Sequence, residues 1–173
     1  INADVRKLTG AKKWGYAIGA LGQIFPITFF NTYAFQYYVY TIGLDASLTS
    51  VGIFLGLFVF ALSSPVFGSL IDNKKPTKFG KRRPFLLLAI PGLIIFMTFA
   101  WTPPKCPIGE PFYIPTAIYF WLFSIGIDLN QGLVVSTYLS MLAEQSTDDE
   151  NRVNVANLQG LFSILAVSYT HLR

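Results

Sequence analysis

The stretch GSLIDNKKPTKFGKRRP, residues 68–84, decides how the rest of the chain is interpreted. Long apolar runs flank it, at residues 48–71 and 85–101. Short loops rich in Lys and Arg stay on the cytoplasmic side of a membrane, so the stretch predicts a cytoplasmic loop between two spanning helices. A soluble basic patch for nucleic acid is the alternative, but soluble domains do not flank such patches with lipid-compatible helices. Six of the 13 basic residues lie here: Lys74, Lys75, Lys78, Lys81, Arg82 and Arg83.

The composition is that of a membrane protein. Of the 173 residues, 53% are hydrophobic and only 13% are charged, whereas soluble domains carry about 25% charged residues. The one cysteine, Cys106, excludes an internal disulfide and a cysteine metal cluster, and the one histidine, His171, excludes a histidine metal site. We therefore predict a multi-pass protein of the cell membrane, surrounded by the lipid bilayer, with no metal, no cofactor and no nucleic-acid partner.

Apolar segments predict five spans with alternating orientation. The basic residues Arg6, Lys7, Lys12 and Lys13 precede the first span, so the N-terminus is expected in the cytoplasm. The connections at 41–47 and 102–111 hold a single basic residue, Lys105, and are expected outside. The predicted spans cover about residues 14–40, 48–71, 84–101, 112–143 and 153–167.

Two local signals predict details of these helices. Ser63, Ser64 and Pro65 predict an interruption of the second span, because proline lacks the N–H that continues a helix. Thr147 and Glu150 form a T-x-x-E pattern, which predicts a capping box at the start of the fifth helix.

Polar side chains recur on one face of the first predicted span and again on one face of the fourth. Their spacings of three and four residues place them on shared faces, with Gln23 about a turn before the others. Polar groups in hydrocarbon are tolerated when they face a bundle interior or a water-filled cavity, and hydrogen bonding between helices is the alternative. We interpret both faces as walls of a cavity for a hydroxyl-rich solute. The predicted substrate-binding residues are Gln23, Thr28, Asn31, Thr32, Gln36, Ser124 and Gln131.

Asp128 is the one charge deep inside a predicted span. A charge at the centre of a span costs about 2.5–3.5 kcal/mol to insert, so it needs a compensating role. A carboxyl group removed from water takes up a proton more readily, and such a group could load and release a proton as a cavity changes sides. The alternative is a structural carboxyl group that joins helices by hydrogen bonds.

Two segments resemble a known family of transporters. GSLID at 68–72, a short basic insert and FGKRRP at 79–84 resemble the signature loop between helices two and three of the major facilitator superfamily. The ending TKFGKRRP is similar to that of the glycoside–pentoside–hexuronide cation symporters (the melibiose-permease group) and their sucrose-symporter relatives. Residues 128–144, DLNQGLVVSTYLSMLAE, resemble helix four of the sucrose symporters, in which an intramembrane Asp precedes a second acidic residue by the same interval.

This resemblance implies an all-α polytopic membrane protein, namely the first five transmembrane helices of a twelve-helix major facilitator fold, truncated. Residues 1–167 would be the incomplete N-terminal half, whose partner is the missing C-terminal half of the same chain. Independently of the resemblance, the apolar part of the fifth span ends near Val167, and residues 168–173, SYTHLR, place a His and an Arg where about another turn of hydrocarbon is expected. We therefore predict that residues 168–173 are a non-native tail.

The resemblance also implies a function. It predicts a secondary transporter that moves a small hydrophilic solute, a sugar or a glycoside, by alternating access. In this family the acidic residue of the signature loop engages a helix end in the other half of the fold and so forms a conformational latch. The residues implied in this loop are Gly68, Asp72, Gly80, Lys81, Arg82 and Arg83.

The sequence departs from the family at the coupling residues. Melibiose-type symporters carry aspartates in helices one and two, where this chain has Ile24, Phe60 and Ser64, and the Arg of sucrose-type helix four is Leu139 here. Coupling to a proton or another monovalent cation through Asp128 is what remains. An uncoupled facilitator is the alternative, and a membrane-embedded enzyme or a non-transporting scaffold is an alternative of another class. An intramembrane enzyme needs paired catalytic groups, which the spans do not offer, so we predict no enzyme.

Overall fold

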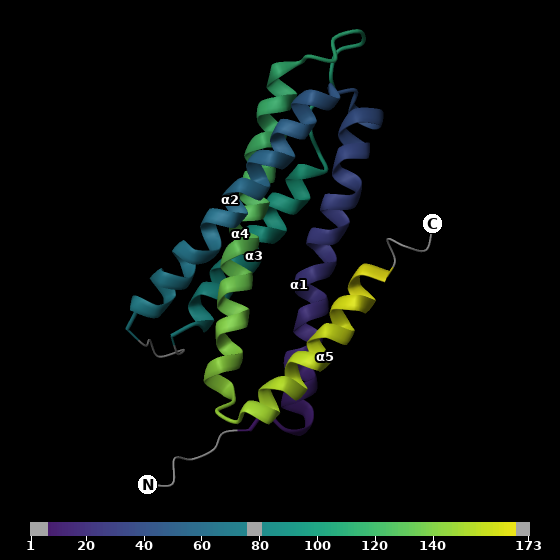
Figure 1. The fold of residues 1–173 in the computed structure, drawn as a ribbon. Coiled ribbons are helices and arrows are strands. Elements are labelled where there is room, and N and C mark those ends of the chain that lie inside the picture. Colours follow the sequence, from purple (N-terminus) through teal and green to yellow (C-terminus); the bar gives the residue numbers. More distant parts are fainter. Residues whose placement is uncertain (1–6, 76–80, 169–173) are drawn as a thin grey trace. The chain divides into compact units, whose positions relative to one another are not determined.

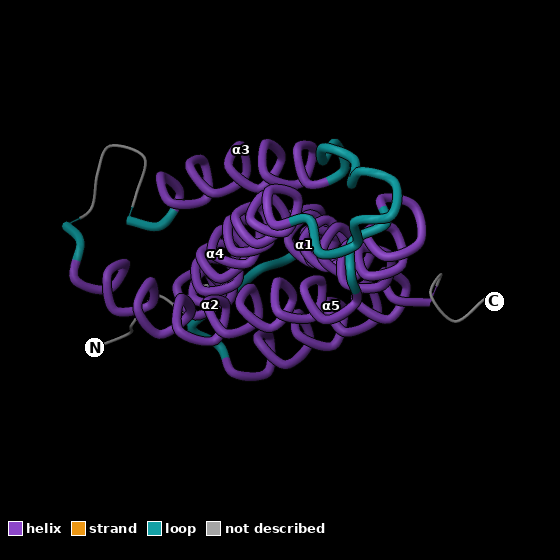
Figure 2. The backbone as a smooth tube through the Cα atoms, turned by 90° about the horizontal axis from the view of Figure 1, so that it is seen from above, coloured by secondary structure: helices purple, strands orange, loops and turns teal. Residues whose placement is uncertain are grey.

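The computed structural model describes residues 7–75 and 81–168, apart from the side chains at positions 143 and 144. Every regular element in this part of the chain is a helix (Figure 2), which confirms the all-α prediction. Of the predicted non-native tail, all but Ser168 lies outside the described residues. The elements are α1 (Gly10–Gln36), the π-helix η1 (Tyr37–Ile42), α2 (Ala46–Asn73), α3 (Arg83–Ala100), α4 (Ile114–Gln145) and α5 (Asp149–Ser168) (Figure 1).

The chain divides into two compact units. The first unit combines the described parts of Ile1–Phe29 and Tyr138–Arg173, and therefore holds most of α1, the end of α4, and α5. The second unit, Phe30–Thr137, holds the end of α1, η1, α2, α3 and most of α4. Two helices, α1 and α4, thus contribute residues to both units.

Three helices in the described part of the chain are long and apolar enough to cross a membrane. They are Ala46–Asn73, Arg83–Ala100 and Ile114–Leu142, which correspond to α2, α3 and most of α4. Helices α1 and α5 have the required length, but polar side chains dilute their apolar character. The spans predicted from the apolar segments at residues 14–40 and 153–167 therefore stay predictions.

In the second unit, α2 and α4 pack side by side and run in the same direction. Near the start of both helices, Trp121 Nε1 donates a hydrogen bond to the carbonyl oxygen of Leu48 at 2.9 Å. Further along both helices, Ser136 Oγ donates to the carbonyl oxygen of Ser64, also at 2.9 Å. Small residues between these two points let the helix backbones approach closely, as small-xxx-small patterns do in membranes.

Helix α2 continues through Pro65, so the predicted interruption of the second span is wrong. Membrane helices tolerate proline when neighbouring Ser and Thr side chains satisfy the carbonyl groups near it. Ser63 Oγ donates to the carbonyl oxygen of Phe60 at 2.9 Å, and Ser136 of α4 donates to that of Ser64. The two serines that precede the proline therefore belong to a continuous hydrogen-bonded helix.

Helix α3 packs antiparallel to α4 within the same unit. Phe96 of α3 lies against Gly126 and Phe123 of α4, while the earlier Gly92 lies against the later Asn130. A side chain at Gly92 or Gly126 would collide with these partners. The remaining surface of α3 is exposed and apolar, with Leu87, Leu88, Ile90, Ile94, Ile95 and Phe99.

The connections at 41–47 and 102–111 lie together at one end of the second unit. The Asp45 N–H donates to the carbonyl oxygen of Pro111 at 2.9 Å. The Tyr38 hydroxyl, from η1, donates to the carbonyl oxygen of Ala100 at 2.6 Å, and the Tyr37 hydroxyl donates to that of Trp101 at 3.0 Å. The structure therefore brings together the two segments predicted to share a side of the membrane, and the assignment of that side to the exterior stays a prediction.

In the first unit, side chains at the start of α5 hold the residues that precede α1. Asn151 forms two hydrogen bonds with the backbone of Leu8, at 2.9 and 3.0 Å. Lys7 pairs with Asp148 at 3.2 Å. Helix α5 begins at Asp149, and Asp148 Oδ2 accepts a hydrogen bond from the Asn151 N–H. The N-cap is therefore Asp148, and the predicted capping box on Thr147 is wrong by one residue, because adjacent Thr and Asp can both fill this role.

Candidate functional site

The second unit buries a carboxyl group and a hydroxyl group between α2 and α4. Asp128 and Ser124, one helical turn apart on α4, are 3% and 1% exposed. Both face Gly56 of α2, which has no side chain. A Cβ atom at position 56 would lie 2.7 Å from Ser124 Oγ and would collide with the Asp128 carboxylate. The glycine is therefore what makes room for these two polar side chains between the helices.

These two polar groups are poorly compensated by their surroundings. Ser124 Oγ has no hydrogen-bond partner among the residues that the structure describes, and no ion pair within those residues involves Asp128. In the described ranges, no group of three or more His, Cys, Asp or Glu side chains could hold a metal ion, and Asp128 is the one acidic residue in the predicted spans. A buried polar group without a partner costs free energy. Binding of a proton or a small cation to the Asp128 carboxylate would remove this cost.

The same contact between α2 and α4 is extended on both sides of Gly56. A Cβ at Gly52 would lie 2.5 Å from the Phe120 ring and 2.6 Å from the Trp121 ring. At the other side, Gly132 of α4 leaves room for the Ser63 hydroxyl of α2. The spacing of Gly52 and Gly56 in the sequence signals a close helix contact, but not which helix supplies the other side.

The remaining predicted substrate-binding residues fall into both units. Gln131 is buried in the second unit, one turn after Asp128. On α1, Asn31 and Gln36 are exposed and Thr32 is half-buried, all in the second unit. Gln23 and Thr28 are half-buried in the first unit. The prediction that the polar faces of α1 and α4 line one cavity stays a prediction.

The structure describes the loop at residues 68–84 in part, up to residue 75 and again from residue 81. Asp72, at the end of α2, pairs with Arg82, just before α3, at 3.5 Å. Lys81 is half-buried and Arg83 is exposed, whereas Gly80 lies outside the described residues. A Cβ at Gly68 would meet nothing within 4 Å, so the described residues provide no close approach there. The latch predicted for this loop stays a prediction.

A pair of tyrosines in the first unit was not foreseen. The rings of Tyr16 on α1 and Tyr138 on α4 stack with centroids 4.7 Å apart and an interplanar angle of 7°. Each hydroxyl donates a hydrogen bond to the backbone carbonyl of the other tyrosine. A Cβ at Gly19 would lie 3.2 Å from the Tyr138 ring. The two residues are 122 positions apart, so no local pattern could have indicated the pair.

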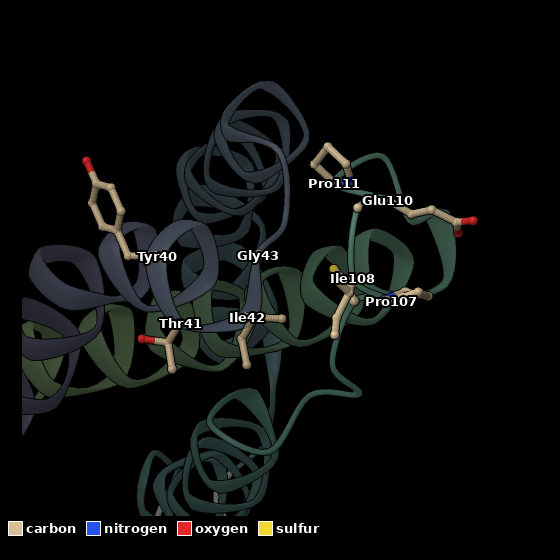
Figure 3. Close-up of a pocket in the computed structure, with 10 residues that line it drawn as sticks. Tyr40, Thr41, Ile42, Gly43, Pro107, Ile108, Glu110 and Pro111 are labelled. Atoms are coloured by element: carbon tan, nitrogen blue, oxygen red, sulfur yellow. The ribbon is translucent and has the colours of Figure 1, made fainter.

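A shallow pocket of about 310 Å³ lies at the end of the second unit where η1 meets the 102–111 connection. Its polar side chains do not converge on one point, since Tyr40 and Glu110 project in opposite directions (Figure 3). The pocket is therefore a weaker candidate for a solute site than the buried polar groups of α4. Its lining residues are Tyr40–Gly43 and Cys106–Pro111.

Comparison with known proteins identifies relatives along most of the chain. The model of the family described as MFS/sugar transport protein matches residues 15–170. An uncharacterized symporter of Bacillus subtilis, YnaJ, is 24% identical over 95% of this chain and 34% of its own length. The isoprimeverose transporter of Lactiplantibacillus pentosus is 21% identical over 91% of this chain and 32% of its own. A glucuronide carrier protein homolog of Escherichia coli is 24% identical over 87% of this chain and 32% of its own length.

The chain spans about a third of the length of the curated relatives it matches. The matched part is their N-terminal portion, as the resemblance of the signature loop and of α4 predicted.

Proposed function

We propose that this chain, which belongs to the MFS/sugar transport protein family, is part of a secondary transporter that moves a sugar or a glycoside by alternating access. Family membership and the apolar helices make the chain part of a multi-pass membrane protein. The names of the relatives, a symporter, an isoprimeverose transporter and a glucuronide carrier, support sugar-like solutes and cation coupling. They also point away from an enzyme.

The observation that carries the coupling proposal is the burial of Asp128 beside Ser124, without an ion pair in the described residues. An ionised carboxylate in this position is costly, and binding a proton removes the charge. When the site opens to water, the carboxyl group can release the proton again. We favour a proton over sodium, because sodium needs several oxygen ligands and the predicted spans contain no acidic residue besides Asp128.

The solute is proposed to bind along the polar faces of α1 and α4. Amide side chains such as Asn31 and Gln36 carry both donors and acceptors, and both are exposed in the second unit. Sugars present several hydroxyl groups that need such partners. Neutral amide and hydroxyl side chains can bind a neutral sugar, whereas an acidic solute would require basic side chains in the site. The other residues proposed for this face are Gln23, Thr28, Thr32, Ser124 and Gln131.

The test of coupling is Asp128→Asn in the full-length protein, reconstituted into liposomes with an imposed pH gradient. We expect the variant to lose pH-driven accumulation of solute and to keep exchange of solute at equal concentrations, because the amide cannot gain or lose the proton. The matched control is Asp149→Asn, the same chemical change at a fully exposed carboxylate whose side chain is 93% accessible. Full accumulation by the Asp128 variant would overturn the coupling role and leave a facilitator or another coupling group.

The orientation is proposed from the excess of basic residues in the N-terminal segment and in the 72–83 loop. In a Cys106→Ser background, a thiol at Ile108→Cys should react with an impermeant reagent added outside intact cells. A thiol at Lys75→Cys should react only after the membrane is opened. Both positions are exposed in the structure, so lack of access would not explain a missing reaction. Labelling of position 75 from outside would reverse the assignment.

A further inference from the structure

The adjoining ends of α2 and α3 present a cluster of cations, which we call the basic patch: Lys74, Lys75, Lys81 and Arg83. Lys74, Lys75 and Arg83 are exposed, and Lys81 is half-buried. Asp72 is the one carboxylate in the described residues 72–75 and 81–83. Because Asp72 pairs with Arg82, its charge is already balanced, and the patch keeps a net positive charge.

Contacts between the two helix ends hold the basic patch in place. The Asp72–Arg82 ion pair joins the last turn of α2 to the residue before α3, at 3.5 Å. The ammonium group of Lys74 lies 5.8 Å from the centre of the Phe85 ring, on α3. Behind them, Ile71 of α2 and Ala89 of α3 belong to the same buried cluster. The cations are therefore presented by two packed helix ends, side by side in Figure 1.

The surface next to the basic patch is apolar and open. Val66 and Leu70 of α2 are 54% and 50% exposed, and Leu87 and Leu88 of α3 are 65% and 71% exposed. Leu70 precedes Lys74 by about one helical turn, which is about 5.4 Å along the axis. In a membrane-spanning protein, a change from exposed apolar to exposed cationic side chains over this distance marks the level of the lipid headgroups.

We propose that the basic patch binds the headgroup phosphate of an anionic phospholipid, whose acyl chains lie along the exposed apolar faces of α2 and α3. Lys and Arg side chains at a membrane surface attract anionic lipids, and their N–H groups form charge-assisted hydrogen bonds with phosphate oxygens. Free inorganic phosphate has the same headgroup chemistry but cannot use the apolar faces. This inference depends on the membrane location and not on the proposed transport function.

The experiment uses the full-length protein in liposomes that contain phosphatidylglycerol and phosphatidylcholine in equal amounts. After mild detergent extraction, the lipids that stay bound are counted by mass spectrometry. The test variant is Lys74→Gln/Lys75→Gln, which keeps the other basic residues of the loop and hence its topology signal. The matched control is Lys12→Gln/Lys13→Gln, which removes the same charge near the start of α1. A parallel arm adds inorganic phosphate to the extract.

We expect the wild-type protein to retain phosphatidylglycerol in preference to phosphatidylcholine. The Lys74/Lys75 variant should lose this preference by about thirtyfold at low salt, the scale expected for two basic side chains at an anionic surface. The Lys12/Lys13 control should keep it. Equal retention by the test and control variants would overturn the proposed site. Displacement of the lipid by millimolar inorganic phosphate would show a phosphate site without lipid specificity, and would overturn the lipid assignment.

Discussion

Helices α3 and α4 pack against each other in the second unit, but α3 buries a much smaller share of its residues than α4 does. Over the most apolar 18 residues, α3 has a mean hydropathy of 1.9 and buries 11% of its residues, whereas α4 has a mean hydropathy of 1.4 and buries 50%. The residues that α4 buries include polar ones, among them Ser124, Asp128 and Gln131. In water, the more apolar helix would be the more buried one.

The difference shows which solvent each helix is built for. Lipid is as apolar as Leu, so exposing the Leu and Ile side chains of α3 to lipid has little cost. Polar side chains, in contrast, must be shielded from the lipid. The polar side chains of α4 are shielded because α4 packs against α2 and α3. Chemistry that depends on polar groups therefore belongs on α4, and α3 serves chiefly to cover it.

The largest effect is expected where α4 has no spare room. Gly56→Leu places a side chain into the space that Asp128 and Ser124 occupy, and should cost about 3 kcal/mol or more, as severe overpacking does. At Gly68, also on α2, an added Cβ would meet nothing within 4 Å. Size-exclusion profiles of fluorescently tagged full-length protein should show loss of the folded peak for Gly56→Leu and not for Gly68→Leu. Equal profiles would mean that α2 and α4 are not in close contact.

A smaller effect is expected from emptying a buried site on α4. Phe120 is fully buried and lies 4.1 Å from the Tyr38 ring, centroid to centroid. Phe120→Ala should lower the free energy of unfolding by about 2 kcal/mol. The substitution leaves a cavity between α4 and η1, and the loss of packing around that cavity costs free energy although lipid is as apolar as the protein interior. Leu88→Ala on the exposed face of α3 should change it by less than about 0.5 kcal/mol. Unfolding measured in micelles checks both, and a comparable loss for Leu88→Ala would show that α3 is covered by protein.

Much of this contrast could be predicted from the sequence. The lack of polar residues in the third span and their abundance in the fourth are visible at once, and the spacing of Ser124, Asp128 and Gln131 places them on one face. The spacing does not say what that face meets. That Gly56 lies opposite Asp128 depends on the register between two helices joined by a third one, which no local pattern encodes.

The errors of the sequence analysis have the same origin. By local rules Pro65 predicts a break, but α2 continues, and the carbonyl oxygen of Ser64 accepts a hydrogen bond from Ser136, 72 residues further along the chain. The choice between Thr147 and Asp148 as N-cap is ambiguous because both side chains can accept the bond. The start of α5 at Asp149 and the hydrogen bond that Asp148 accepts from the Asn151 N–H identify Asp148 as the N-cap.

The smallest expected effect concerns how the neighbouring helices begin. Helix α2 starts with a side-chain cap: Asp45 accepts a hydrogen bond from the Ser47 N–H at 2.8 Å and another from the Ser47 hydroxyl. Helix α3 has no side-chain cap at Arg82. The hydrogen bonds from Ser47, first from its hydroxyl and then from its N–H, hold the pKa of Asp45 below its ordinary value of 3.8. The carboxylate therefore contributes to stability above that pH, and the contribution is lost as the pH falls through the lowered pKa.

Asp45→Ala should therefore lower the Tm of the full-length protein slightly at neutral pH, because α2 loses its cap. The difference in Tm from wild type should shrink as the pH falls below about 3.8 and through the lowered pKa, where the carboxylate of the folded wild-type protein takes up its proton. Ser50→Ala is the matched control, since its exposed hydroxyl donates to the carbonyl oxygen of Ala46 within the same helix, at 2.8 Å. The effect of Ser50→Ala should not depend on pH, because the hydroxyl does not titrate in this range. Thermal scans of the three proteins from pH 7 to pH 3 measure both differences. A difference in Tm between Asp45→Ala and wild type that stays constant down to pH 3 would show that the charge of the carboxylate does not contribute to the cap. The start of α2 would then resemble the uncapped start of α3, and the contrast between the helices would rest on packing alone.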